Sequence, residues 1–249
     1  MRSVGKRIFG IFAGSCFLVM LAATGASAQM LQSTDRAFVG VSFGSQTKAR
    51  TFTATGSQPL YDETVTFDSS VGIGSSSIID VSGGVRVWSN FAIGLGFAKY
   101  SDTSTGTVSA SIPDPLFFDA PHSVSATVAN LKHEESQVSV SAYWLQPMTD
   151  KIDLAFFAGP TFFGVKQGLA TGITVASGTS TIASVTQTQV DESTVGLHAG
   201  LDVRYLVTKN VGAGAFVRFT SGSVDAAAVT GGKIDVGGLQ YGAGLRFRF

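Results

Sequence analysis

The chain has 249 residues, with 17 basic and 17 acidic side chains, and it is rich in Gly, Phe, Val, Ser and Thr. Its length suits one domain, and its even charge balance does not suggest a nucleic-acid-binding protein. The composition favours strands and turns over helices.

The first segment reads as a secretory signal peptide. A short basic stretch, 1–7, precedes a mostly apolar run, 8–23, and the small-residue site Ala26-Ser27-Ala28 follows. We expect cleavage after Ala28 and Sec-dependent export of a single domain, 29–249. The alternative is a membrane anchor, but the apolar run falls short of the roughly 18–20 residues that a spanning helix needs.

Removal of the leader changes the charge and the thiol content. It takes away three basic residues, so 17 − 3 = 14 basic side chains remain against 17 acidic ones, a net charge of −3. Cys16, the only cysteine, leaves with the leader. The mature chain is then predicted to have no disulfide, thiolate nucleophile or zinc-thiolate site.

Eight later segments alternate apolar and polar residues, which predicts β-strands with two unlike faces. In chain order they are 37–43, 79–87, 91–98, 138–144, 152–158, 194–205, 211–219 and 239–249. The fifth segment is expected to continue to Val165, although Pro160 weakens its pattern. Long polar stretches join alternate pairs at 44–77, 101–136, 167–192 and 221–238, and short turns join the others at 88–90, 147–150 and 208–210.

This order of long and short connections predicts an eight-stranded antiparallel up-and-down transmembrane barrel. Short periplasmic turns would lie at one end and long extracellular loops at the other, with both termini on the short-turn side. The alternating segments come close to the 9–11 residues with which a tilted strand crosses a bilayer.

The two faces of the strands support a membrane location. One face carries Val, Leu, Ile, Ala and aromatic residues, and the other carries Gly, Ser, Thr and charges. A soluble ligand-binding barrel would turn its apolar face inward instead. Aromatic residues of the apolar face fall at both strand ends, as in the girdles of membrane barrels. Those near the short turns are Trp88, Phe91, Trp144, Tyr205, Phe247 and Phe249, and those near the long loops are Phe43, Phe97, Phe162, Phe219 and Tyr241.

The eight alternating segments, the leader and the last strand, Tyr241-Gly-Ala-Gly-Leu-Arg-Phe-Arg-Phe249, resemble the small outer-membrane barrels of Gram-negative bacteria, the OmpA transmembrane domain and OmpX type. The resemblance implies the cell outer membrane as location, with outer-membrane lipid and lipopolysaccharide as surroundings. It also implies that the barrel-assembly machinery reads the terminal strand. The assembly signal would comprise Tyr241, Leu245, Phe247 and Phe249.

Charged residues on the polar face are expected inside the barrel, because charge facing lipid costs about 2–4 kcal/mol at the bilayer centre. They are Asp80, Arg86, Asp153, Asp202, Arg204, Arg218, Arg246 and Arg248. We interpret them as a polar plug of ion pairs, since eight strands enclose little more than their own side chains. A narrow ion path is the alternative. The five arginines outnumber the three acids, so two arginines are expected to need water, backbone carbonyls or loop acids such as Asp191 and Glu192 as partners.

No pattern of catalytic residues emerges. His122 and His133 fall in the second long stretch, and His198 faces inward. No His and Ser lie two apart on one strand, as a rim-located hydrolase would require, so we assign no catalytic residue. No calcium-loop spacing and no dinucleotide fingerprint occurs, so neither a metal nor a cofactor is predicted.

The second long stretch is the most distinctive. Its segments 107–112 and 123–128 are near copies with strand alternation, and they flank a Pro-rich, aromatic centre. We expect strands that extend beyond the membrane and end in a contact surface for a host, a partner protein or lipopolysaccharide. A tip folded onto its neighbours is the alternative. The contact residues would be Pro113, Pro115, Leu116, Phe117, Phe118 and Pro121.

Together these patterns predict a monomeric, non-enzymatic outer-membrane protein. Its role would be structural or adhesin-like and carried by its extracellular loops. A small pore or transporter and, less favoured, an outer-membrane lipid hydrolase or acyltransferase are the alternatives.

Overall fold

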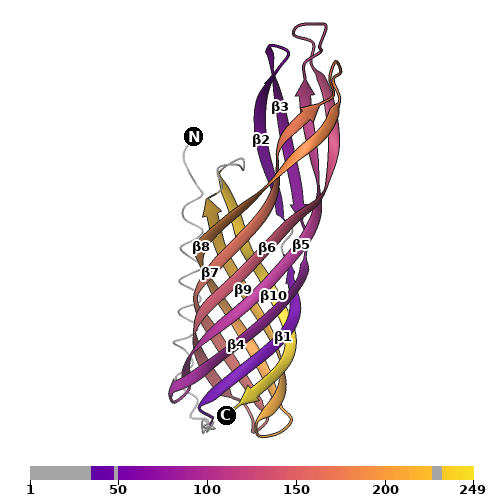
Figure 1. Ribbon diagram of the computed structural model, residues 1–249. Coiled ribbons are helices and arrows are strands. Elements are labelled where there is room, and N and C mark those ends of the chain that lie inside the picture. The colour runs from indigo at the N-terminus through magenta and orange to yellow at the C-terminus, as the bar shows by residue number, and fades with distance from the viewer. Residues whose placement is uncertain (1–34, 48–49, 226–231) are drawn as a thin grey trace, which may run out of the picture. The chain divides into compact units, whose positions relative to one another are not determined.

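The computed structural model describes residues 35–47, 50–225 and 232–249, shown in Figure 1. The predicted signal peptide, 1–28, lies outside these residues. The described part is a single ten-stranded antiparallel sheet. Its strands are β1 (Ala37–Thr47), β2 (Arg50–Leu60), β3 (Glu63–Ile73), β4 (Ser76–Trp88), β5 (Phe91–Ile112), β6 (His122–Pro147), β7 (Ile152–Val175), β8 (Ile182–Leu206), β9 (Val211–Asp225) and β10 (Lys233–Arg248).

Eight of these strands close into a barrel. The order of pairing is β5-β4-β1-β10-β9-β8-β7-β6, and β6 pairs again with β5. The last strand closes on the first, because β10 pairs along β1 from Phe38↔Arg248 to Thr47↔Leu239. Backbone bonds continue this seam beyond the strands, where the Phe249 amide donates to Ala37 O at 2.9 Å. The predicted eight-stranded antiparallel barrel is confirmed.

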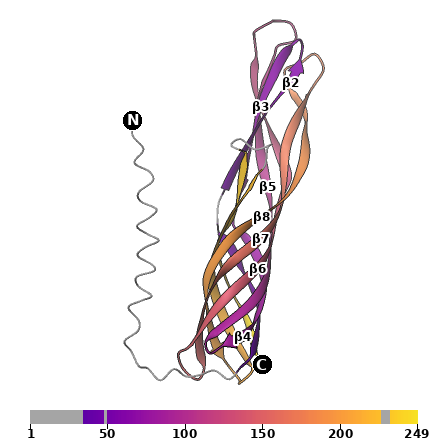
Figure 2. The ribbon, with the colours of Figure 1, turned by 90° about the vertical axis from the view of Figure 1, so that its left-hand side faces the viewer.

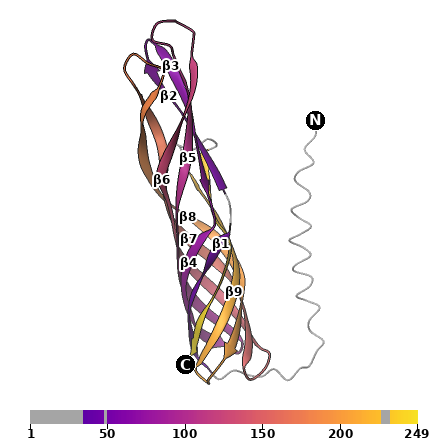
Figure 3. The ribbon, with the colours of Figure 1, turned by 90° about the vertical axis from the view of Figure 1, so that its right-hand side faces the viewer.

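The remaining two strands were not predicted. The stretch 44–77, which we expected to be a loop, contains the hairpin β2–β3, and β3 pairs with β5 from Thr66↔Ser111 to Val71↔Gly106. Figures 2 and 3 show this hairpin at the end of the barrel opposite the C-terminus. The expected third loop, 167–192, is also largely strand, because β7 and β8 pair as far as Val175↔Ile182. Side chains of Ser and Thr masked this regularity in the sequence, since they are common in loops and strands alike.

An apolar belt surrounds the short-turn half of the barrel. The outward side chains of each ring strand are mostly apolar and exposed, and each series ends at a definite residue. The last apolar outward residues are Phe43, Ile79, Phe97, Val138, Phe162, Val195, Phe219 and Leu239. Along β10 and the residue after it, the belt runs from Leu239 to Phe249, a separation of 249 − 239 = 10 residues, which at roughly 3.4 Å per residue and 40° of tilt spans about 25 Å.

Beyond the belt the two faces exchange their character. On β5 the exposed residues change from Phe91, Ile93, Leu95 and Phe97 to Lys99, Ser101, Thr103, Thr105, Thr107 and Ser109. The inward residues change in the opposite sense, from Ala92, Gly94, Gly96 and Ala98 to Val108, Ala110 and Ile112. The register between β5 and β6 shifts between Ser104 and Gly106, but β5 keeps its own alternation throughout, so the change in its faces reflects their surroundings.

We call the part beyond the belt the outer region; it comprises β2, β3 and the ends of β5–β8 that lie beyond Lys99, Ser136, Gly164 and Ser193. It has a core of its own between the sheet β2–β3–β5–β6 and the hairpin β7–β8. The buried members of this core are Val65, Phe67, Val71, Val108, Ala110, Ile112, Val128, Leu131, Ala170 and Ile173. Apolar inside and polar outside, it is built like a water-soluble domain.

Candidate functional site

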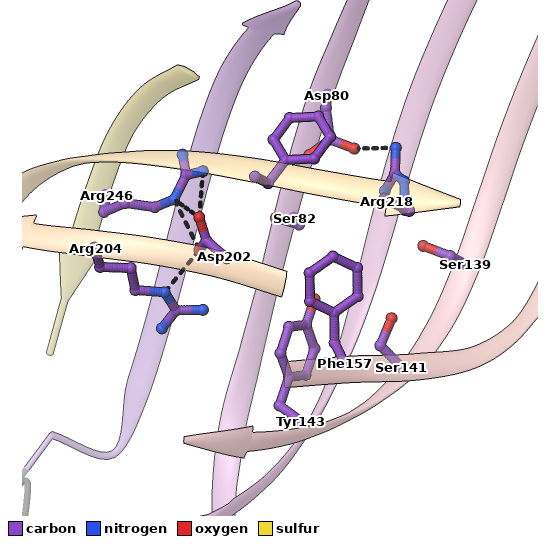
Figure 4. Close-up of a pocket in the computed structure, with 11 residues that line it drawn as sticks. Asp80, Ser82, Ser139, Ser141, Tyr143, Phe157, Asp202, Arg204, Arg218 and Arg246 are labelled. Carbon is purple, nitrogen blue, oxygen red and sulfur yellow. Dashed lines mark hydrogen bonds and ion pairs between the residues drawn. The ribbon is translucent and has the colours of Figure 1, made fainter. Parts of the chain in front are cut away.

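The polar interior lies inside the belt and holds the charges that the sequence placed on the inward face. Its centre is Asp202, which accepts hydrogen bonds from Arg204 Nε at 2.7 Å and Arg246 NH2 at 2.8 Å. Arg246 also donates to Ser42 Oγ, and the Arg204 guanidinium lies 4.3 Å over the Phe38 ring. Figure 4 shows both arginines converging on the one carboxylate.

A second group lies nearer the outer region. Arg218 NH2 lies 2.8 Å from Asp80 Oδ2, and its Nε donates to Gln240 Oε1 at 2.7 Å. Both charged residues are at most 5% exposed. The space left between the two groups is a cavity of about 20 Å³ lined by Ser82, Ser139 and the charged residues, about the size of one water molecule.

A third group closes the short-turn end. Arg248 NH1 lies 2.7 Å from Asp153 Oδ2 and 3.4 Å from Asp35 Oδ1, and Arg86 NH2 lies 3.4 Å from Asp35 Oδ2. Of the partners expected for the surplus arginines, backbone carbonyls do accept from Arg86, at Asp35 O and Ser89 O, whereas the expected pairing with loop acids was wrong. Asp191 and Glu192 are exposed on β8, and Asp35, just before β1, takes that place. Sequence reasoning missed Asp35 because it precedes the alternating segment.

The interior also contains a hydrogen-bonded layer that the sequence reading did not assign. His133, predicted to lie in a loop, is buried on β6, where Nε2 lies 2.9 Å from Glu135 Oε1 and Nδ1 lies 2.6 Å from Gln167 Oε1. Glu135 Oε2 accepts from the Gly237 amide and from Gln46 Nε2. Both Glu135 and His133 lie in phase with Ser139 and Ser141, so extending the alternation of β6 would have placed them inside.

Apolar side chains cover this layer on the side of the outer region. They are Phe52, Ile73, Tyr100, Phe163, Val165, Leu169, Val224, Ile234 and Val236. The Tyr100 ring packs edge-on against His133, with centroids 5.7 Å apart. Polar groups and this apolar cluster thus fill successive levels of the barrel interior, as a plug of side chains would.

His198 and Ser141 make a contact that resembles a nucleophile–base pair. Ser141 Oγ lies 2.8 Å from His198 Nε2, and Thr161 Oγ1 lies 2.8 Å from Nδ1. A catalytic arrangement would place a carboxylate on Nδ1 and open the serine to substrate. Here a hydroxyl takes the place of the carboxylate, and both partners are buried at 4% and 2% exposure. The contact therefore lacks both the carboxylate and the accessible serine of such a catalytic arrangement.

The tip of the β5–β6 hairpin is the outermost apolar feature. Leu116, Phe117 and Phe118 are 84%, 67% and 74% exposed, and within the described residues every other exposed large hydrophobic side chain belongs to the belt region or its short turns. Pro121 is exposed and Pro115 half-buried. Pro113 is a correction to the predicted contact surface, because it is buried at the base of the tip, where its carbonyl accepts from Ser180 Oγ.

Hydrogen bonds hold this tip in shape. Asp114 Oδ1 accepts from the amides of Leu116 at 2.8 Å and Phe117 at 3.1 Å, and Oδ2 lies 2.9 Å from His122 Nε2. The bond from the Leu116 amide, then the bond with His122 and, more weakly, the bond from the Phe117 amide lower the pKa of the Asp114 carboxyl below its ordinary value of 3.8. The base of the tip is thus folded onto its neighbours while its apex stands free, which combines the two alternatives drawn from the sequence.

The predicted assembly residues lie on the outer face of β10 and at its end. Tyr241, Leu245 and Phe249 are 48%, 54% and 66% exposed, and Phe247 is half-buried. Their side chains face away from the barrel interior, where an assembly factor or lipid can reach them. A role in assembly stays a prediction.

Two other kinds of feature are absent from the described residues. No group of three His, Cys, Asp or Glu side chains within 35–47, 50–225 and 232–249 is placed to hold a metal ion. No helix in that same part of the chain is long and apolar enough to cross a membrane.

Comparisons with known proteins give no family-model match and no match among curated sequences. Solved structures with a similar fold include Neisserial surface protein A, at 14% identity over 86% of this chain and 97% of that one, with a TM-score of 0.44. The attachment invasion locus protein Ail of Yersinia pestis, in complex with the heparin analogue sucrose octasulfate, matches at 11% identity over 85% and 99%, with a TM-score of 0.38. The outer membrane protease OmpT of Escherichia coli matches at 9% over 90% and 100%, with a TM-score of 0.32. The barrel assignment rests on the closed ring of strand pairs, independently of these likenesses.

Proposed function

We propose that the chain is an outer-membrane barrel whose outer region makes contacts outside the cell. The observation that carries this proposal is the exchange of faces between Phe97 and Lys99 on β5, and at the matching positions of the other ring strands. Apolar side chains face outward over about 25 Å, the height of the apolar band of membrane barrels. Beyond it, a water-exposed polar face covers an apolar core, so this part belongs in aqueous surroundings.

In this arrangement the belt contacts outer-membrane lipid and lipopolysaccharide, and the assembly machinery inserts the barrel. A contact role is favoured over catalysis because the interior charges are engaged with one another and the Ser141–His198 pair is enclosed. It is favoured over transport because side chains fill the lumen, most clearly the apolar layer around Tyr100 and Phe163. The exposed tip is the surface that contact chemistry would use.

Topology is tested by labelling single cysteines on intact cells with a membrane-impermeant maleimide. In a background where Cys16 is changed to Ser, Ser177→Cys at the β7–β8 turn should react, and Asp150→Cys at a short turn should react only after the outer membrane is opened. Both positions are exposed. The reverse pattern, or mature protein in the soluble periplasm, would overturn the proposal.

The contact role is tested separately. Cells displaying the protein are compared with cells in which a short Gly-Ser turn replaces 114–121, for retention on surfaces coated with lipid, matrix protein or glycan. Loss of retention on at least one surface is expected. Equal retention on every surface, together with steady single-channel conductance in planar bilayers, would favour the pore alternative.

A further inference from the structure

The tip of the β5–β6 hairpin has the properties of a lipid-inserting loop. Leu116, Phe117 and Phe118 are consecutive, and they are the only strongly exposed large hydrophobic side chains in the described part of the outer region. The rest of this region keeps its apolar residues inside and exposes Ser, Thr and charges. A contiguous apolar apex on a polar support marks a contact site and not an ordinary surface residue.

Two backbone amides of the apex already have a hydrogen-bond acceptor within the loop. The amides of Leu116 and Phe117 both donate to Asp114 Oδ1, so they lose little when water is removed. A bilayer interior offers no hydrogen-bond partner, whereas a protein pocket does. An apex in which the amides of Leu116 and Phe117 are bonded internally therefore suits lipid better than it suits a polar-rimmed protein groove.

The acidic residues around the apex indicate which type of lipid bilayer it can approach. Asp114 and Asp119 flank the apex, and the neighbouring β2–β3 turn adds Asp62 and Glu63. No Lys or Arg lies in either segment, 61–63 or 113–121. An anionic bilayer would repel this acidic end, and so would sulfated or phosphorylated polymers, whereas a zwitterionic bilayer would not.

The reach of the hairpin shows that this bilayer is not the protein's own. Phe97 ends the belt on β5 and Ile112 ends the strand, a separation of 112 − 97 = 15 residues. At roughly 3.3 Å per residue this is about 50 Å along the strand. The loop is also ordered before binding, by Asp114, His122 and the bond from Ser180 to Pro113, so little conformational freedom is lost on insertion.

We propose that Leu116, Phe117 and Phe118 insert into the outer leaflet of a second, zwitterionic membrane. This inference rests on the proposed outer-membrane topology and specifies the ligand of the contact surface.

The test uses the full mature protein in nanodiscs, mixed with sucrose-loaded vesicles of phosphatidylcholine. Co-sedimentation with these vesicles is expected, and it should fall at least tenfold in the triple variant Leu116→Ser, Phe117→Ser, Phe118→Ser. Vesicles containing phosphatidylglycerol should bind more weakly, and Asp119→Lys should reduce that difference. Retention of the heat-modifiable gel shift shows that each variant is folded.

Insertion itself is read from Phe117→Trp, with phosphatidylcholine brominated on its acyl chains in the target vesicles only. The two natural tryptophans, Trp88 and Trp144, lie in the belt region and face the nanodisc lipid. Quenching should appear with Phe117→Trp and be absent from the parent protein. If bromine quenches the fluorescence of neither the Phe117→Trp variant nor the parent protein, the inference is overturned.

Other outcomes separate this inference from the proposed function. If cells lose retention on matrix protein in the triple variant while phosphatidylcholine is not bound, the apex has a protein partner and lipid insertion is wrong, but the contact role stands. If the nanodisc-held protein associates with itself through the apex, a second copy is the occupant and the inference is again wrong. If Ser177→Cys is not labelled on cells, the topology fails first.

Discussion

The belt region and the outer region are parts of the same strands with opposite chemistry. In the belt the barrel wall is apolar outside and encloses ion pairs, and in the outer region the wall is polar outside and encloses aliphatic residues. The strands β5 to β8 run through both regions, which is possible because strand phase fixes only which residues share a face. Which face is apolar depends on what surrounds it. On β5 the boundary between the lipid-facing and the water-facing part of the outer surface therefore lies between Phe97 and Lys99.

Removing a carboxylate should give the largest difference in unfolding free energy between the two regions. Asp202→Asn leaves Arg204 and Arg246 without their shared charge inside the belt, and breaking such a buried group should lower the free energy of unfolding by about 3–5 kcal/mol. Asp68→Asn makes the same change on the exposed face of β3 and should cost less than about 0.5 kcal/mol. Urea unfolding of the refolded barrels in detergent or lipid measures both. Equal losses would contradict the picture of a structural ion-pair core.

A charge added to the outer face of the barrel wall should also destabilise the protein much more in the belt than in the outer region. Leu95→Arg places a guanidinium on the lipid face of β5 and should cost about 2–4 kcal/mol. Thr103→Arg lies on the same face of the same strand, beyond Phe97, and should have almost no effect because it faces water. The comparison uses the same unfolding measurement in lipid bilayers. A comparable penalty at Thr103 would mean that lipid extends into the outer region.

Removing apolar side-chain volume should destabilise the outer region more than the belt, which is the opposite of the order expected for the two changes of charge. Val108→Ala leaves a space in the core of the outer region, where Val108 is fully buried, and should destabilise that region by about 1–3 kcal/mol. Val81→Ala, on the lipid face, leaves a smaller side chain against adaptable acyl chains and should cost less. Hydrogen exchange of the outer β5 and β6 amides reads the first effect. If Val108→Ala instead weakened only the amides between β1 and β10, the outer region would have no separate core.

The sequence alone was sufficient for the eight ring strands, because each shows several alternations of large apolar residues with Gly, Ser or charges. It was insufficient for β2, β3 and the outer ends of β7 and β8. Their inward residues, such as Val65 and Phe67, alternate with Thr and Asp in a pattern that loops also show. Once the faces exchange, the rule that the apolar face meets lipid no longer applies. The near copies 107–112 and 123–128 kept their alternation and did indicate extended strands.

The sequence predicts which charged side chains face the barrel interior, but it does not predict which of them form ion pairs with one another. Alternation placed Asp202, Arg204 and Arg246 on one face, yet which pairs form depends on barrel stagger, which one sequence does not specify. Asp35 pairs with Arg86 and Arg248 although it stands outside any alternating segment. Glu135 and His133 were missed because the expected loop, 101–136, covers the first part of β6, which begins at His122.

The smallest expected effect is a pH response confined to the tip. Since the folded tip lowers the pKa of Asp114, its order is fully present above the ordinary pKa of 3.8 and is lost as pH falls through the lowered value. Between neutral pH and pH 5 the amide resonances of Leu116 and Phe117 should therefore not move, and they should shift only in more acidic solution. Asp114→Asn keeps an acceptor oxygen but cannot titrate, so it should remove the acidic shift and leave the amides bonded. Movement of these amides between neutral pH and pH 5 in the wild-type protein would contradict control of the tip by the Asp114 carboxyl.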